Sequence, residues 1–337
     1  MDKTIPFYIS KTVGVSIKDL SKDKMNWFIN CSKTERDFIF SVKDNYNRLL
    51  EELVLLEDNK ILNAAILLFG KNPQKYCPAA LIKCSHYYGT KVTRPIPNQK
   101  MFDGDLFQQV DSAVDFVLSK LNRTVGGRNQ GATAKVIEEI PNEVIAEIIV
   151  NAVVHRDYDS SGSIQISIFS DRIEIMNPGK LPKQLKISDL NKKHLSIPVN
   201  PFLARPFYLA GYINQLGYGT VNVFNWCKKA HLPEPSFEQL NNQFSVTIWR
   251  NWLTDNNIQE FDLNERQIAA IKYLKEHLKI TNSQYQKEFN VAKRTASKDL
   301  QLLTSLGLVS KEGTTGKGVF YKIAKGAPKG HKGHRLF

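Results

Sequence analysis

Two side chains one helical turn apart, those of Glu147 and Asn151, are of the types that metal-assisted phosphate chemistry uses. A carboxylate such as Glu147 can take a proton from an attacking water. The neutral amide oxygen of Asn151 can complete the oxygen shell of Mg²⁺ while phosphates and water fill its other positions. By itself, the pair is interpreted more simply as part of a solvated polar stripe on an amphipathic helix. The neighbouring segments are therefore needed to distinguish a phosphate site from a solvated polar stripe.

The helix that positions this pair is predicted from Pro141 to Val154. Proline is favoured in the first turn of a helix, where its missing N–H is not needed. The helix has one broad apolar face, formed by Val144, Ile145, Ile148, Ile149, Ala152 and Val153. The polar stripe runs down another side through Glu143, Glu147, Asn151 and His155. His155 and Arg156 are interpreted as residues that end the helix near its negative dipole end.

The segments that follow the helix favour a nucleotide site. Alternating residues predict a β-hairpin from 163–169 and 172–176, closed by Asn177-Pro178-Gly179. A long segment with two prolines spans 180–200, and residues 217–220 (Gly-Tyr-Gly-Thr) then open another helix. Glycine lets the backbone approach a ligand closely, and the N-terminus of a helix presents free N–H groups to phosphate.

In combination, these segments resemble the ATP-binding domain of the GHKL superfamily. The narrower resemblance is to bacterial transcriptional regulators labelled "RecG-like" or "divergent AAA". It rests on residues 147–158, 171–182, 200–220 and 232–235, and it covers about residues 60–250. The resemblance implies an α+β fold in which helices cover a mixed sheet, as a GHKL-like α/β sandwich.

The resemblance also implies a role for each motif residue. Glu147 would be the general base, and Asn151 would hold Mg²⁺. Asn177 stands where the superfamily usually has an aspartate that recognises adenine, and an uncharged amide there implies weaker adenine affinity. The other residues that would contact the nucleotide are glycines and a hydroxyl residue: Gly179, Gly217, Gly219 and Thr220. Residues 180–215 would form a lid, whose lysines, with Arg205, could reach a triphosphate.

The C-terminal part of the chain predicts a DNA-binding unit. Three short helices and a glycine-rich hairpin within 263–324 are the outline of a winged helix-turn-helix. Residues 262–337 hold 15 Lys and Arg against 6 Asp and Glu, so +9 of the net charge of +13 lies there. The residues expected to contact DNA are basic or carry hydroxyls: Lys293, Arg294, Thr295, Ser297 and Lys298 on the third helix, and Lys311 and Lys317 at the wing. The alternatives are a solvated basic face and a winged helix that contacts only proteins.

Composition narrows the class of protein. The four cysteines lie far apart without a Cys-x-x-Cys pair, which favours a reduced, cytoplasmic chain over a zinc or disulfide scaffold. No signal peptide is recognised, and the longest apolar stretches, 61–69 and 144–154, are too short for the roughly 20 residues that span a bilayer. The chain has no Gly-x-x-x-x-Gly-Lys-Ser/Thr motif, so a P-loop helicase is not supported.

The expected organisation has five parts. Residues 1–60 form an N-terminal helical or irregular segment, which the resemblance interprets as a remnant of an AlbA-type domain. A nucleotide-binding region spans 61–250 with its core at 136–250, and a linker at 251–262 leads to the winged helix at 263–324. A basic, disordered tail spans 325–337.

The favoured function is an ATP-binding, DNA-binding transcriptional regulator in which Mg-ATP modulates the winged helix. A homodimer is the corresponding expectation, because half-sites are commonly paired. The alternatives are a slow Mg²⁺-dependent ATPase delivered to double-stranded DNA, and a DNA-binding regulator whose nucleotide site has decayed.

Overall fold

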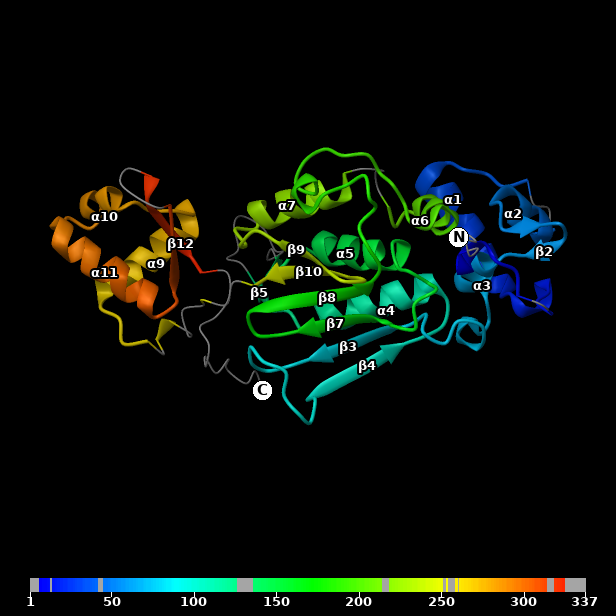
Figure 1. Cartoon of the computed structure of the whole chain (residues 1–337), viewed down its shortest axis with the longest axis horizontal. Coiled ribbons are helices and arrows are strands. Elements are labelled where there is room, and N and C mark those ends of the chain that lie inside the picture. Colours follow the sequence, from blue (N-terminus) through cyan, green and yellow to red (C-terminus); the bar gives the residue numbers. More distant parts are fainter. Residues whose placement is uncertain are drawn as a thin grey trace.

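The computed structural model describes residues 6–12, 14–41, 45–125, 136–213, 218–250, 253, 258–259, 261–313 and 318–324. Gly217, Lys317, most of the expected linker and the whole tail from 325 therefore lie outside the described residues. The expected α+β class and mixed sheet are confirmed. Figure 1 shows the sheet with helices layered over it.

A six-stranded sheet is the centre of the fold, with the order β4-β3-β7-β8-β10-β9. β3 and β7 are parallel, and the other neighbours are antiparallel. The strands are β3 (Ile82–His86), β4 (Asn98–Phe102), β7 (Ile164–Ile168), β8 (Arg172–Pro178), β9 (Ser236–Leu240) and β10 (Gln243–Trp249). The predicted hairpin is confirmed as β7–β8, in which Ile168 pairs with Ile173. Asn177 and Pro178 are strand residues, so their interpretation as a closing turn is wrong.

Three helices lie on the same side of this sheet: α4 (Leu106–Leu118), α5 (Asn142–Val154) and α7 (Gly219–Lys229). The strands alternate buried and partly exposed residues, because one face packs under the helices. The apolar face of α5 is buried, including Ile145, Ile149 and Val153. In contact with both α4 and α7, α5 is the central helix of the layer.

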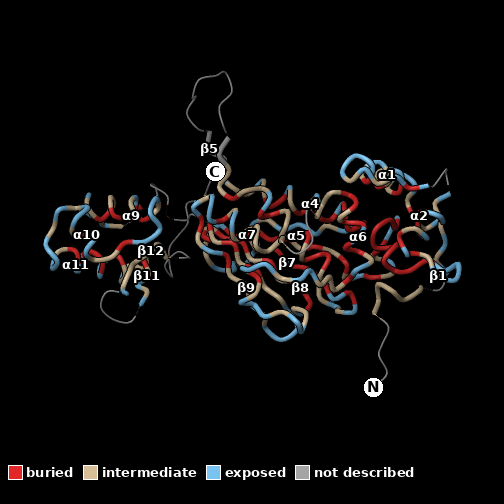
Figure 2. Tube along the Cα trace, turned by 90° about the horizontal axis from the view of Figure 1, so that it is seen from above, coloured by how far each residue is buried: buried red, intermediate tan, exposed pale blue. Residues whose placement is uncertain are grey.

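The N-terminal elements pack on the same continuous core. They comprise α1 (Lys22–Arg36), α2 (Tyr46–Glu52), the hairpin β1 (Leu56–Glu57) and β2 (Lys60–Ile61), and α3 (Asn63–Phe69). Phe28, Phe69 and Phe107 are fully buried and in contact with one another, which joins these helices to α4. Figure 2 shows that α1 is exposed along its outer side. Helix α6 (Pro201–Leu209) completes this region.

Short elements connect these layers. The 3₁₀ helices are η1 (Phe7–Ile9), η2 (Ile17–Asp19), η3 (Pro73–Lys75) and η4 (Ile187–Asp189). A small two-stranded sheet consists of β5 (Arg123–Val125) and β6 (Val136–Glu138). Directly after β6, Glu139 forms a two-bond ion pair with buried Arg250, at 2.6 and 2.8 Å, which ties the start of α5 to the end of β10.

A second core is formed by the C-terminal elements. They are α9 (Glu265–His277), α10 (Asn282–Glu288), α11 (Lys293–Ser305) and the antiparallel hairpin β11 (Val309–Glu312) and β12 (Phe320–Ile323). Ile271, Leu300 and Leu303 are fully buried there. Buried Asp299 accepts hydrogen bonds from Arg266, Gln267 and Tyr285, at 2.7, 2.8 and 3.0 Å.

We expect Asp299→Ala to lower the free energy of unfolding of this unit by about 3 kcal/mol, because three donors, two of them buried, lose their common acceptor. Burial raises the pKa of Asp299, but these hydrogen bonds outweigh it and hold the pKa below the usual carboxyl range. The contribution is therefore present at neutral pH and is lost as the pH falls through that lowered pKa. Urea unfolding followed by circular dichroism measures it. Glu276→Ala, an exposed acid on α9, should change stability by less than about 0.5 kcal/mol, and an equal effect of both variants would contradict the prediction.

Candidate functional site

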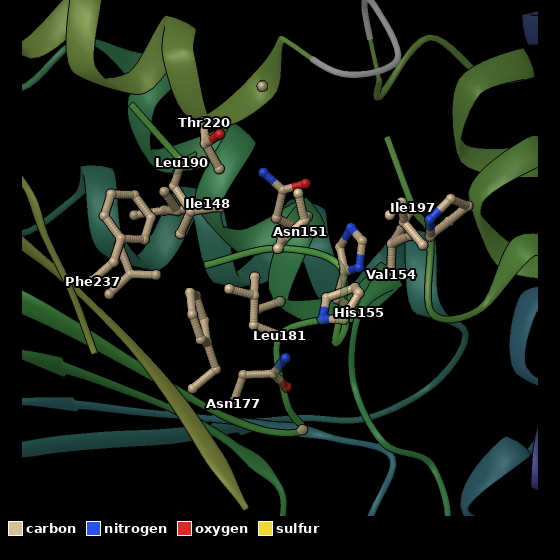
Figure 3. Close-up of a pocket in the computed structure, with 18 of the residues that line it drawn as sticks. Ile148, Asn151, Val154, His155, Asn177, Leu181, Leu190, Ile197, Thr220 and Phe237 are labelled. Carbon is tan, nitrogen blue, oxygen red and sulfur yellow. The ribbon is translucent and has the colours of Figure 1, made fainter. Parts of the chain in front are cut away.

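A cavity opens between α5, the sheet and the segment that follows β8 (Figure 3). Its empty space, counted together with its open mouth, is about 1170 Å³. Most of its lining is apolar, with Ile148, Ile175, Leu181, Leu190, Ile197, Phe237 and Val246 among the contributors. A few polar side chains project between them, as is typical of sites that orient a bound molecule.

Glu147 and Asn151 both line this cavity, on the side formed by α5. The amide nitrogen of Asn151 donates a hydrogen bond to Glu147 Oε1 at 2.9 Å. Among the described residues, Asn151 Oδ1 has no hydrogen bond, so the acceptor atom of this amide is available for a ligand. Burial raises the pKa of Glu147, and the hydrogen bond from Asn151 opposes that shift. The carboxyl is thus a better proton acceptor than an exposed glutamate would be.

The N-terminus of α7 closes against this pair. A Cβ at Gly219 would overlap Glu147 Oε1 and would lie 3.5 Å from Asn151 Nδ2, so only glycine fits without displacing the carboxylate. Gly219 and Thr220 are the first two residues of α7, and both line the cavity. The free N–H groups at the start of this helix therefore border the same space as Glu147.

Asn177 lies at the floor of the cavity, near the end of β8. The residue is buried, and its Oδ1 has no hydrogen-bond partner among the described residues. A buried polar atom left unpaired costs about 1–3 kcal/mol. Gly179 follows with a φ of +151°, and a Cβ there would come within 3.0 Å of the carbonyl oxygen of His155. Glycine thus lets the chain turn away from β8 close to the end of α5.

Residues 180–198 supply one wall of the cavity. Leu181, Leu190 and Ile197 pack into it, and Lys180 is also part of the lining. His194 Nε2 lies 2.9 Å from Thr220 Oγ1, so this segment contacts the start of α7. Asn200 donates to the carbonyl oxygens of Val154 and Arg156, at 2.8 and 2.7 Å, which fixes the segment's far end to the last turn of α5.

Two histidines in the lining were not among the predicted site residues. His155 follows the last residue of α5, and burial lowers its pKa to about 4, with a further decrease from the charge of His194. A signal for His155 existed in the sequence, because it continues the stripe of Glu147 and Asn151 by one more turn. No sequence signal indicated His194, which belongs to an irregular segment.

Two arginines near this site do not line the cavity, whereas one lysine of residues 180–215 does. Arg156 is fully buried and donates to the carbonyl oxygens of Ala79, Ser160 and Gly162. Arg205 donates to the carbonyl oxygen of Glu52. Lys180 lines the cavity, and the Nζ of Lys193 lies over the ring of Tyr218.

The predicted DNA-contacting side chains gather on one end of α11. Lys293, Arg294, Ser297 and Lys298 are exposed, whereas Thr295 is partly buried. Asn282 of α10 donates to Ser297 Oγ at 3.0 Å. Lys311 is exposed on β11. These residues form one basic surface on α11, with Lys311 on a separate element.

No described helix is long and apolar enough to cross a membrane. Within the same residues, no cluster of three or more His, Cys, Asp or Glu side chains could hold a metal ion by itself. A cation at Glu147 and Asn151 would therefore need ligands from a bound molecule or water, as is usual for Mg²⁺.

A family model matches the central region of the chain. Residues 161–248 match a family model described as "Putative ATP-dependent DNA helicase recG C-terminal", about a quarter of the chain. The match supports a RecG-like ATPase domain that runs from β7 to β10. It includes Asn177, Gly179 and Thr220 but stops short of Glu147. A search of curated proteins found no match.

The crystal structure of the DIP2311 protein from Corynebacterium diphtheriae has a similar fold, with a TM-score of 0.57. Sequence identity is 16%, so the likeness concerns the fold alone. The alignment covers 96% of this chain and 65% of that protein's chain. The present chain thus corresponds to somewhat less than two thirds of its length.

Proposed function

We propose that the cavity binds ATP together with Mg²⁺, and that the bound nucleotide modulates DNA binding by the C-terminal unit. One observation carries the nucleotide part of this proposal. Glu147, Asn177, Gly219 and Thr220 come from three separate elements, α5, β8 and α7, and all line one cavity. The alternative of a solvated polar stripe is disfavoured, because Glu147 is only partly exposed, lines the cavity and lies against the N-terminus of α7.

The residues present fit the nucleotide and its cation. Asn177 has a buried oxygen without a partner, which a base with a donor group would satisfy. Asn151 Oδ1 would hold Mg²⁺, which would neutralise phosphate charge when bound. Thr220 and the free N–H groups of α7 would contact the phosphates, and Gly179 would leave room beside the base. Lys180 would add a positive charge at the same cavity.

We assign the second activity to residues 263–324, as a winged helix. Its helix order, its hairpin and the basic end of α11 support major-groove binding, in which Lys293, Arg294, Thr295, Ser297 and Lys298 contact the duplex. Lys311 and Lys317 would contact phosphates from the wing. Residues 61–250 would be the nucleotide-binding region, and a transcriptional regulator that acts as a dimer on paired half-sites is the corresponding biological role.

Titration calorimetry of the full chain with a non-hydrolysable ATP analogue tests this function, with and without Mg²⁺. We expect binding that strengthens in the presence of Mg²⁺ and that changes the affinity for duplex DNA. An absence of binding would reject the nucleotide part. Binding without any change in protease sensitivity of residues 180–213, or in DNA affinity, would reject the coupling.

A second candidate, slow ATP hydrolysis, is favoured by the raised pKa of Glu147. Glu147→Gln should then reduce turnover by ~10²–10⁴-fold while nucleotide affinity changes little, because an amide cannot accept the proton. Wild-type turnover should rise with pH through the raised pKa of Glu147, since only the ionised form is a base. Phosphate release measured from pH 4 to 8 checks both expectations.

Thermal unfolding of the Glu147→Gln variant shows whether a loss of turnover comes from a loss of folding. A carboxyl whose pKa is raised in the folded state makes the folded state less stable as the pH rises past that value. Glu147→Gln should therefore unfold at no lower a temperature than the wild type at pH 7. A variant that keeps full turnover would contradict the role of Glu147 as the base.

A further inference from the structure

The amide of Asn177 is the feature of the cavity that most directly indicates the chemistry of a ligand. It is 5% exposed, and its Oδ1 lacks any partner among the described residues. Figure 3 shows this amide at the floor of the cavity, below Leu181. Buried polar atoms are nearly always paired in proteins. Figure 3 shows the amide nitrogen on the side of Leu181 and the oxygen on the opposite side. Turning the amide by 180° brings the oxygen toward the cavity, where a bound molecule would supply the missing hydrogen bond.

The surroundings of Asn177 favour a flat ring as that molecule. The residue lies opposite Phe244, and its neighbour on the same face of β8, Ile175, lies opposite Val246. All four residues line the cavity, as does Leu181. Apart from the amide itself, these walls are apolar. A ring would cover them with its faces and present one polar edge to Asn177.

The hydrogen-bonding pattern that the ring's polar edge must have depends on whether residue 177 is an asparagine or an aspartate. A carboxylate offers acceptors only, whereas an amide has one acceptor oxygen and one NH₂ donor on the same carbon. The matching edge carries a donor next to an acceptor. Adenine has its amino group beside N1, and a 6-oxopurine has O6 beside an N1–H. Turning the amide by 180° exchanges its oxygen and nitrogen, so one side chain can match either edge.

We propose that Asn177 pairs with the six-position edge of a purine nucleotide through both amide atoms, and that the cavity accepts 6-amino and 6-oxo purines with similar affinity. This inference rests on the proposed nucleotide function. It makes residue 177 the determinant of base specificity, because no other polar side chain of the described cavity lies on β8 or β10.

Calorimetry on the full wild-type chain tests this with three diphosphates in the presence of Mg²⁺: ADP, IDP and the diphosphate of unsubstituted purine riboside. We expect the dissociation constants of ADP and IDP to agree within about tenfold, since each base can form two hydrogen bonds to the amide. The unsubstituted purine should bind at least ~5-fold more weakly than either, because it lacks the group at position six.

The variant Asn177→Asp sharpens the test. It should keep ADP binding and weaken IDP binding at least ~10-fold relative to ADP, because a carboxylate repels O6 and cannot donate to it. Asn225→Asp adds the same charge on an exposed position of α7 outside this cavity and should leave the ratio unchanged. If Asn177→Asp fails to fold, the relative affinities of the wild-type chain for the three diphosphates still test the proposal.

The possible results distinguish failure of the proposed base specificity from failure of the proposed nucleotide binding. Wild-type binding of ADP with IDP more than ~10-fold weaker would overturn the shared specificity and leave nucleotide binding intact. An unchanged ratio in a folded Asn177→Asp variant would overturn the role of Asn177. Failure of all three ligands to bind would instead reject the proposed nucleotide site.

Discussion

The triple variant Lys293→Ala/Arg294→Ala/Lys298→Ala is expected to bind duplex DNA about 100- to 1,000-fold more weakly at low salt. These three cations are exposed and lie within the first two turns of α11. Each cation that neutralises a phosphate releases a counterion, so losing three contacts should reduce the slope of log K against log salt by about 3. Fluorescence anisotropy with a labelled duplex at several salt concentrations measures both quantities.

The matched control removes the same charge from other elements of the same unit. The variant Lys272→Ala/Lys279→Ala/Lys287→Ala removes three exposed lysines. Lys272 is on α9, Lys287 is on α10, and Lys279 lies between these helices, next to Ile280, which forms a β-bridge with Tyr321 of β12. This variant should lose little affinity beyond the general effect of net charge. If both triple variants weaken binding equally and shift the salt slope equally, α11 is not the recognition surface, and the basic unit binds DNA through charge alone.

The basic surface of α11 also illustrates what periodicity can predict. Leu300 and Leu303 are buried, which orients the helix and leaves Lys293, Arg294 and Lys298 exposed. Helix α5 and the β7–β8 hairpin were predictable for the same reason, because burial on one face imposes a period of 3.6 or of 2 on the sequence. The boundaries predicted for α5, β7 and β8 differ from the observed ones by no more than two residues.

Other elements lacked such a signal. Helix α1 buries only Met25, Phe28 and Ser32 among its 15 residues, so its apolar stripe is too narrow to distinguish it from a loop. Strand β4 lies at the edge of the sheet and has no fully buried residue, so its sequence, Asn98–Phe102, does not alternate. Both elements depend on contacts with distant segments, which one sequence does not reveal.

The contacts of the candidate site also differ in whether local sequence could predict them. Glu147 and Asn151 are four residues apart on a helix, so their proximity follows from helical geometry. The approach of Gly219 to Glu147, and of His194 to Thr220, joins segments 72 and 26 residues apart in the sequence. Only the resemblance to a known family linked residue 219 to residue 147 in advance. The burial of Asn177 on a strand, rather than in a turn, required the register of β8 with β10.

Gly219→Ala is expected to weaken Mg²⁺-dependent ATP binding about 30-fold while the protein remains folded. The new Cβ would overlap Glu147 Oε1, and the carboxylate would have to leave the hydrogen bond from Asn151 to make room. Overpacking of this kind costs about 1–3 kcal/mol. Here it would displace side chains proposed to contact the ligand, so the cost would appear as a loss of binding affinity. Because the overlapping atom is the end of a flexible side chain, thermal unfolding should change much less than affinity. Gly89→Ala, where no atom lies within 4 Å of the added Cβ, should change neither quantity.

A second substitution identifies the cause of the loss. Removing the carboxylate with Glu147→Ala opens the space that the new methyl group needs, so Gly219→Ala/Glu147→Ala should bind the non-hydrolysable ATP analogue better than Gly219→Ala alone. Contacting residues are expected to be non-additive in this way, with a coupling of about 0.5–3 kcal/mol. Additive losses in the double variant would mean that Gly219 acts through the α7 backbone and not through Glu147. Unchanged affinity in Gly219→Ala would mean that the ligand does not use this end of the cavity, because the methyl group and the displaced carboxylate would both lie in its path.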